Sequence, residues 1–161
     1  MTGLTPTTFG PVINLSRAQF AVILWRMNGL PVMEYRAVFP DVPEGTWYTD
    51  AVLWANLNGI ITGYSHNGHF GSADNITREQ MALMMYRYAN EKSYDTSKKA
   101  DFGSFKDAAS VSEFAIDGMQ WAVGNSIITG KDNGTALDPQ GNASRAECAT
   151  IIMRFSKIYE E

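Results

Sequence analysis

Apolar residues recur at helical spacing in three segments of the chain. Each set follows the i, i+3, i+4, i+7 order that places side chains on one face of a helix. The sets are Phe20, Ile23, Leu24 and Met27; Met81, Met84, Met85 and Tyr88; and Cys148, Ile151, Ile152 and Phe155. The pattern therefore predicts three helices, each with one buried face.

The same polar signal stands at the start of each predicted helix. A hydroxyl residue is followed three positions later by Gln or Glu, in the pairs Ser16 and Gln19, Thr77 and Gln80, and Ser144 and Glu147. In such a capping box the hydroxyl accepts a hydrogen bond from a first-turn N–H, and the longer side chain accepts one from the N–H of the cap residue. We expect three capped helix starts at equivalent points of a repeated unit.

Two of the three units carry a shorter helix upstream. The segments of about residues 47–58 and 113–125 place small residues and a tryptophan on one expected buried face: Ala51, Trp54 and Ala55, and Gly118, Trp121 and Ala122. The loop that follows is rich in Gly, Asn and Asp, and Phe70 or Leu137 is expected to fill the core between the two helices. A complete unit is thus predicted to be helix–loop–helix.

The units divide the chain unevenly. We assign residues 1–34 to the second half of repeat 1, residues 35–95 to repeat 2, and residues 96–161 to a linker and repeat 3; the polar, aperiodic part of that boundary is residues 91–104. On this division repeat 1 is truncated, and the chain is expected to begin inside a repeat. Because such small units bury little apolar surface alone, the repeats are expected to pack on one another.

Composition and charge argue against a nucleic-acid-binding protein and against a membrane-spanning chain. The 161 residues carry a net charge of −4 without long charged runs, which argues against a nucleic-acid partner. No apolar run is long enough to span a membrane, and the start of the chain lacks a secretory signal, so an exported protein is expected to be longer than this chain. The lone cysteine, Cys148, leaves no intramolecular disulfide.

The arginine after each cap is a candidate anion receptor. The three are Arg17, Arg78 and Arg145. A cation in the first turn faces the positive end of the helix dipole, at a cost of about 0.3–1 kcal/mol, so its repetition indicates a use. A guanidinium beside exposed first-turn N–H groups would hold a carboxylate or phosphate. The alternative is a structural ion pair with a neighbouring carboxylate, and the residues alone leave both open.

Other candidate sites are weaker. His66 and His69 lack a third ligand for zinc, the Asp132–Asp138 segment lacks the spacing of a calcium loop, and Cys148 occupies a core position. We predict no metal site, no cofactor and no catalytic residue. A second recurring set is interpreted as a solvated or salt-bridged face: Arg26, Arg87 and Arg154.

The recurring motifs resemble those of the S-layer homology family. A complete repeat is matched by Phe39-Pro40-Asp41-Val42, Trp47-Tyr48, Trp54-Ala55, Gly59-Ile60-Ile61-Thr62-Gly63 and Ile76-Thr77-Arg78-Glu79-Gln80. A second match runs from Phe105 to Arg154, and the first thirty or so residues resemble the back half of another repeat. The resemblance implies an all-α fold in which three repeats form a pseudo-threefold bundle with grooves between neighbouring repeats.

The resemblance also implies a function. It implies non-enzymatic, non-covalent anchoring of a surface protein, outside the cell, to an acidic and often pyruvylated secondary polysaccharide of the bacterial cell wall. Aromatic side chains are expected to stack on sugars, and Asp41 and Asp107 to accept from hydroxyl groups. The expected ligand-binding residues are Arg17, Arg78, Arg145, Asp41, Asp107, Trp47, Gly63, Gly130, Thr77, Ser16 and Ser144.

The chain departs from the family pattern in several places. Gln19 and Gln80 replace the usual glutamate, and repeat 3 has Phe114, Ala115 and Ala143 at three motif positions, so its groove is expected to bind weakly or only to support the bundle. Repeat 1 lacks a first helix, a gap that a partner chain (a homodimer through the incomplete repeat), a rearrangement, or residues of a longer intact protein could fill. The rival interpretation is a protein–protein assembly module with vestigial glycan grooves.

Overall fold

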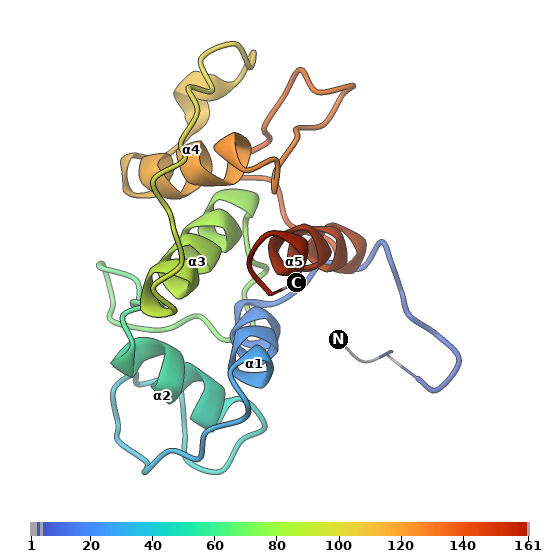
Figure 1. The fold of residues 1–161 in the computed structure, drawn as a ribbon. Coiled ribbons are helices and arrows are strands. Elements are labelled where there is room, and N and C mark those ends of the chain that lie inside the picture. The colour runs from blue at the N-terminus through green and yellow to red at the C-terminus, as the bar shows by residue number, and fades with distance from the viewer. Residues whose placement is uncertain (1–2, 4, 161) are drawn as a thin grey trace. The chain divides into compact units, whose positions relative to one another are not determined.

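The computed structural model describes residue 3 and residues 5–160, and this part of the chain folds into helices joined by long loops (Figure 1). In chain order the elements are α1 (Arg17–Met27), α2 (Thr49–Leu57), α3 (Arg78–Glu91), η1 (Ala108–Ser110), η2 (Glu113–Ala115), α4 (Ile116–Gly124) and α5 (Arg145–Tyr159). The described residues form isolated β-bridges but no strand. The all-α prediction is confirmed, whereas the pseudo-threefold packing and the truncated first repeat stay predictions.

The three long helices begin at the predicted caps. The hydroxyl groups of Ser16, Thr77 and Ser144 each accept from the N–H three residues later, at 3.2 Å in all three. Each cap N–H in turn donates to the side chain of that later residue, so all three capping boxes are complete. The predicted apolar faces are buried, except that Met27 and Ile152 are half-buried.

The chain forms two compact units. One unit contains Leu15–Ile76, and we call it the α1–α2 unit; the other contains Met1–Asn14 together with Thr77–Glu161, and we call it the α3–α5 unit. The segment before Asn14 thus belongs with the C-terminal half of the chain rather than with the helix that follows it. Each unit has its own buried core.

In the α1–α2 unit, α1 packs on α2 and the loop after α2 closes the core. Trp54 is 3% exposed and Phe70 is fully buried, as predicted for both. Gly59 ends α2 with a φ of +68°, which glycine adopts without strain.

In the α3–α5 unit, α3 and α4 pack closely because α4 carries a glycine at the contact (Figure 1). A Cβ atom on Gly118 would lie 2.8 Å from the Cα of Leu83, too close for any side chain. Trp121 is fully buried, with its ring centroid 5.7 Å from that of Tyr86 and 6.3 Å from that of Phe155. The predicted helix of residues 113–125 begins as the single turn η2 and continues as α4.

The segment interpreted as a linker lies against α4. Residues 92–104 contain no helix, yet the N–H of Ala100 donates to the carbonyl of Gln120 at 3.0 Å. The side-chain amide of Asn125 donates to the carbonyl of Lys98 at 2.9 Å. The backbone of this segment is therefore hydrogen-bonded to the fold at several points.

Candidate functional site

Each of the three arginines stands at a helix start that a loop from another part of the chain braces. The N–H of Arg17 donates to Asp74, that of Arg78 to Gly141 and that of Arg145 to Ile13. The N–H of the next residue donates to a second carbonyl of the same loop in all three cases. With the third N–H bound to the cap hydroxyl, the first-turn donors are occupied.

This arrangement corrects one part of the anion-receptor hypothesis. The sequence argument required exposed first-turn N–H groups beside the guanidinium, and these groups instead hold loop carbonyls. The physical reason is that orphan N–H groups at a buried helix start need partners, and the neighbouring loop supplies them. Any anion at these sites would be held by side chains rather than by the helix terminus.

The arginine side chains are fixed by the same loops. The Nε of Arg17 donates to the carbonyl of Phe70, that of Arg78 to Leu137 and that of Arg145 to the carbonyl at position 9, each at 2.8 Å. The three arginines are only 5–6% exposed. A buried guanidinium with a fixed Nε has a defined orientation, which favours specific recognition over a diffuse charge effect.

The three braces follow a cyclic order along the sequence. The loop that precedes Arg78 braces Arg17, and the loop that precedes Arg145 braces Arg78. The loop that precedes Arg17 braces Arg145, which is why the segment before Asn14 belongs to the α3–α5 unit. Each of these loops therefore braces the start of a helix other than the one that follows it in the sequence.

Two aromatic rings lie close to the guanidinium group of Arg17. The guanidinium carbon of Arg17 lies 4.7 Å from the ring centroid of Tyr64 and 4.9 Å from that of Phe70. Burial lowers the pKa of Arg17, and the nearby Tyr64, Asp74 and Asp41 oppose this shift. At Arg145, the Phe9 ring lies 4.9 Å from the guanidinium carbon.

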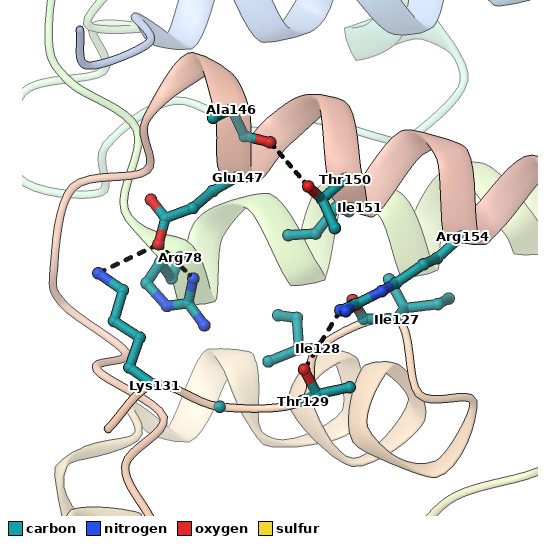
Figure 2. A pocket seen from close by; sticks show the side chains of 11 residues that line it. Arg78, Ile127, Ile128, Thr129, Lys131, Ala146, Glu147, Thr150, Ile151 and Arg154 are labelled. Atoms are coloured by element: carbon teal, nitrogen blue, oxygen red, sulfur yellow. Dashed lines mark hydrogen bonds and ion pairs between the residues drawn. The ribbon is translucent and has the colours of Figure 1, made fainter. Parts of the chain in front are cut away.

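Arg78 lines a pocket of about 240 Å³ in the α3–α5 unit (Figure 2). Its Nη1 lies 3.0 Å from Oε1 of Glu147, and the Nζ of Lys131 lies 3.1 Å from the same oxygen. Arg154 completes the cationic lining: its Nη1 donates to the carbonyl of Ile127 at 3.1 Å and to the hydroxyl of Thr129 at 3.3 Å. Three helix and loop segments far apart in the sequence thus converge on one pocket.

Glu147 and Lys131 are charged at neutral pH. Burial alone would raise the pKa of Glu147, but the Ser144 N–H, Lys131 and Arg78 together lower it. Burial alone would lower the pKa of Lys131, but its contacts with Asp138 and Glu147 raise it. Glu147 has two roles. Its side chain completes the capping box of α5, and it also forms an ion pair with Arg78.

Asp41 and Asp107 support loops. The Oδ1 of Asp41 accepts from the N–H of Phe70 at 2.7 Å, and its Oδ2 accepts from Gly71 at 2.7 Å. Asp107 repeats the arrangement with the N–H groups of Leu137 and Asp138, at 2.8 and 2.7 Å. Both carboxylates hold the loop that carries the core residue between the two helices, a role that the sequence argument missed.

The Asp41→Asn variant is expected to have a lower melting temperature than the unaltered protein. Its melting temperature is also expected to change less as the pH falls. Burial alone would raise the pKa of Asp41, but the backbone N–H groups outweigh it and lower the pKa. An unfolded aspartate has a pKa of about 4, so this stabilisation is complete above about pH 4 and is lost as the pH falls through the folded-state value. The variant is expected to lose about 1 kcal/mol at pH 7 and progressively less below pH 4.

Thermal unfolding of both proteins between pH 7 and about pH 2.5 measures this effect. Glu113→Gln is a suitable control, because Glu113 is exposed. If the melting temperatures of Asp41→Asn and of the unaltered protein differ by the same amount at every pH, the assigned role is contradicted.

The remaining predicted residues differ in their surroundings. Trp47 is 62% exposed and packs edge-on against Tyr48, with 5.1 Å between ring centroids. A Cβ on Gly63 would lie 2.9 Å from the carbonyl oxygen of His69, and Gly130 has a φ of +85° and lines the Arg78 pocket. The hydroxyls of Ser16, Thr77 and Ser144 serve as helix caps.

The pocket brings together only part of the predicted set. Of the predicted ligand-binding residues, Arg78 and Gly130 line it. Arg154, interpreted from the sequence as a solvated or salt-bridged residue, is a lining residue as well. Lys131 was missed, because the corresponding residue of the other complete repeat is Tyr64 and no repeated pattern marks the position.

Among residues 3 and 5–160, no group of three or more His, Cys, Asp or Glu side chains is placed to hold a metal ion. No helix in that part of the chain is both long and apolar enough to cross a membrane.

More than half of the chain matches a known family model. Residues 38–82 and 104–149 match the model of the S-layer homology domain. The two matched stretches fall in repeats 2 and 3, and they include Arg78 and Arg145 together with the loops that brace the helix starts at Arg17 and Arg78.

The relatives combine this region with different larger proteins. An endoglucanase of Bacillus sp. (strain KSM-635) is 34% identical over 152 residues, which are 94% of this chain and 16% of that protein. An amylopullulanase of Thermoanaerobacterium thermosulfurigenes is 35% identical over 93% of this chain and 8% of its own length. The surface-layer 125 kDa protein of Lysinibacillus sphaericus is 30% identical over 91% of this chain and 12% of its own length.

The matched region makes up only a small part of each relative. The chain spans 8–16% of the length of these three relatives, two of which are named as enzymes and one as a surface-layer protein. A region common to proteins with such different names does not carry the named enzymatic activity. The match to a surface-layer protein and to a cell surface glycoprotein of Acetivibrio thermocellus indicates a cell-surface module.

Proposed function

The chain belongs to the S-layer homology family, and from this membership we propose that it holds a bacterial surface protein non-covalently on a secondary polysaccharide of the cell wall. We propose further that the polysaccharide is acidic, with a pyruvate ketal as one suitable acidic group. The module itself performs no catalysis in this proposal.

The observation that carries the proposal is the charge of the Arg78 pocket. Among its described lining residues, the side chains of Arg78, Lys131 and Arg154 are cationic and Glu147 is the carboxylate. The pocket therefore has an excess of positive charge in a chain whose net charge is −4. A cleft lined by one sign of charge concentrates ligands of the opposite sign.

The geometry of Arg78 supports recognition of a carboxylate. Its Nε and Nη1 are held by the Leu137 carbonyl and by Glu147, so the guanidinium plane is fixed before the ligand arrives. A fixed guanidinium binds a planar acidic group with less loss of entropy than a mobile side chain. The pocket volume of about 240 Å³ is below that of drug-sized sites, which suits one or two units of an extended polymer.

The Arg17 and Arg145 sites are proposed as equivalent positions with different surroundings. Arg17 contacts two rings, whereas Arg145 contacts Phe9. Trp47, with most of its surface exposed, is proposed to stack on a sugar. The cyclic order of loop contacts supports the proposed pseudo-threefold relationship of the repeats.

Binding to purified cell-wall sacculi tests the proposed function. The chain is expected to sediment with intact sacculi and to lose at least about tenfold in affinity (about 1.4 kcal/mol) on sacculi stripped of their secondary polymer. Lys131→Ala is expected to weaken binding, while Lys106→Ala serves as the matched control, because Lys106 pairs with Asp132 outside the pocket. Equal binding to stripped and intact sacculi would refute the proposal.

A further inference from the structure

The chain between α1 and α2 contains a short segment whose side chains alternate in exposure. Residues 30–38 form no helix (Figure 1). The side chains at positions 31, 33 and 35 are half-buried, whereas those at positions 32, 34 and 36 are exposed. This alternation is typical of an extended chain with one face on the protein and the other in solvent. We call residues 31–38 the edge segment.

The inner face of the edge segment is fixed to the α1–α2 unit at two points. The Nε1 of Trp25 donates to the carbonyl of Pro31 at 2.8 Å. The hydroxyl of Tyr35 donates to the carbonyl of Val42 at 3.2 Å. The segment is therefore held in place before any partner arrives, which reduces the entropy lost on association.

The backbone of the edge segment is unpaired. Within the described part of the chain, no N–H group of residues 32–37 and no carbonyl of residues 32–35 has a hydrogen-bond partner. The segment ends in a tight turn, where the N–H of Val38 donates to the carbonyl of Arg36 at 2.8 Å. An extended segment with free backbone groups can pair with a strand of another chain.

The outer face of the edge segment carries two opposite charges. Glu34 and Arg36 are both exposed and follow one another on this face. No ion pair among the described residues includes either side chain. Both charges are thus available to a partner.

Exposed apolar side chains lie near these charges. Val32 is 88% exposed, Leu57 is 70% exposed and Val38 is 43% exposed. Val38 and Leu57 also line, together with Met33 and Leu53, a pocket of about 210 Å³ that the edge segment shares with α2. A cluster of exposed apolar side chains beside an unpaired backbone is typical of an interaction surface.

A second copy of the edge segment complements the first in one register. If two copies pair antiparallel about a two-fold axis at Tyr35, Glu34 of each copy lies opposite Arg36 of the other, and both cross-strand pairs are attractive. A shift of two residues places Glu34 opposite Glu34 or Arg36 opposite Arg36. A shift of one residue turns the outer side chains to the wrong face.

We propose that the edge segment is a homodimer interface, in which two copies of the chain pair antiparallel through residues 32–36 with Glu34 opposite Arg36. The two-fold axis requires a self-complementary surface, and this order of charges supplies one. In the same register the exposed Val32 of each copy lies towards the Val38 end of the other, so apolar side chains also approach each other.

The proposed interface leaves the Arg78 pocket unchanged. The edge segment belongs to the α1–α2 unit and the Arg78 pocket to the α3–α5 unit, and no residue lines both this pocket and the one beside α2. A dimer therefore carries two Arg78 pockets and would bind an extended polymer with higher avidity than one chain. Only this consequence rests on the proposed function, because the dimer itself needs no glycan.

Sedimentation equilibrium of the isolated chain from about 10 µM to about 1 mM tests the proposal. We expect a monomer–dimer equilibrium. Glu34→Arg makes both cross-strand pairs repulsive, because the two-fold axis repeats the change, and is expected to raise the dissociation constant at least about tenfold. Arg36→Glu is expected to have the same effect.

Combining the two changes gives the decisive measurement. The double variant Glu34→Arg/Arg36→Glu again places opposite charges across the axis, so we expect it to dimerise like the unaltered chain. Glu113→Arg is the matched control, because it changes the net charge as Glu34→Arg does at an exposed position outside the edge segment. This control is expected to leave the dissociation constant unchanged within about twofold.

Three results would overturn the proposal. The first is a monomer throughout the concentration range, which would leave the edge segment to a partner of another sequence. The second is a dimer that neither single variant weakens, which would place the contact elsewhere on the chain. The third is a double variant that stays as weak as the single variants, which would exclude the register with Glu34 opposite Arg36. Since no sacculi are used, these outcomes are separate from those of the wall-binding experiment.

Discussion

Replacing Arg78 with alanine is expected to reduce binding to intact sacculi by about tenfold to a hundredfold and to destabilise the fold by about 1–3 kcal/mol. Binding falls because the variant removes the cation that is fixed in the pocket by Leu137 and Glu147. Stability falls because the Leu137 carbonyl loses a buried donor. The loss stays moderate because Glu147 is 27% exposed and keeps Lys131 as a partner.

The two effects of this variant can be separated. Affinity is measured at a temperature at which circular dichroism shows the variant to be folded. Arg78→Lys retains the positive charge but loses the planar guanidinium group. Its affinity for sacculi is therefore expected to lie between those of the unaltered protein and of Arg78→Ala. Lys106→Ala removes a cation from an exposed ion pair outside the pocket and controls for net charge. Unchanged affinity of Arg78→Ala would mean that the arginine only braces the helix start.

Replacing Trp121 with alanine is expected to cost about 3–5 kcal/mol and to lower the melting temperature by about 10 °C. The indole is fully buried between α3 and α5, and its Nε1 donates to the hydroxyl of Tyr159 at 3.2 Å. The variant therefore leaves a cavity and also removes aromatic contacts with Tyr86 and Phe155.

Trp47→Ala is the matched control for this prediction. The Trp47 side chain is 62% exposed, so its removal is expected to change the unfolding free energy by less than about 0.5 kcal/mol. Thermal or urea unfolding of both variants gives the comparison. Similar losses for the two tryptophans would contradict the assignment of Trp121 to the core.

The two tryptophans also show how much of the fold could be predicted. A burial pattern repeats at helical spacing around Trp54 and Trp121, and both are in the core. The pattern does not show how α4 begins: the predicted helix starts as a separate 3-10 turn, Glu113–Ala115. Local spacing determines which side chains are buried, but the start of this helix depends on contacts such as that of the Ser112 N–H with Glu79 at 2.9 Å.

The candidate site was less predictable than the fold. Arg78 was found because it recurs at each cap, and Gly130 because it ends a repeated motif. Lys131 occurs at that position in one repeat only, since the corresponding residue of the other is Tyr64, and no repeat signal marks it. Its role depends on the approach of Glu147 from α5, a contact across 16 residues of sequence that no pattern of spacing contains.

The amino-acid sequence by itself determined the repeated units, the helix starts and the buried faces. These depend on interactions between residues three or four positions apart, such as the capping box of Thr77 and Gln80. Only the tertiary structure decided which loop braces which helix, and it thereby showed that the first-turn N–H groups are occupied. It also decided which side chains share the Arg78 pocket. These features depend on contacts between segments that are distant in the sequence. A repeated local pattern is compatible with several such pairings of segments, and only the folded structure shows which pairing occurs.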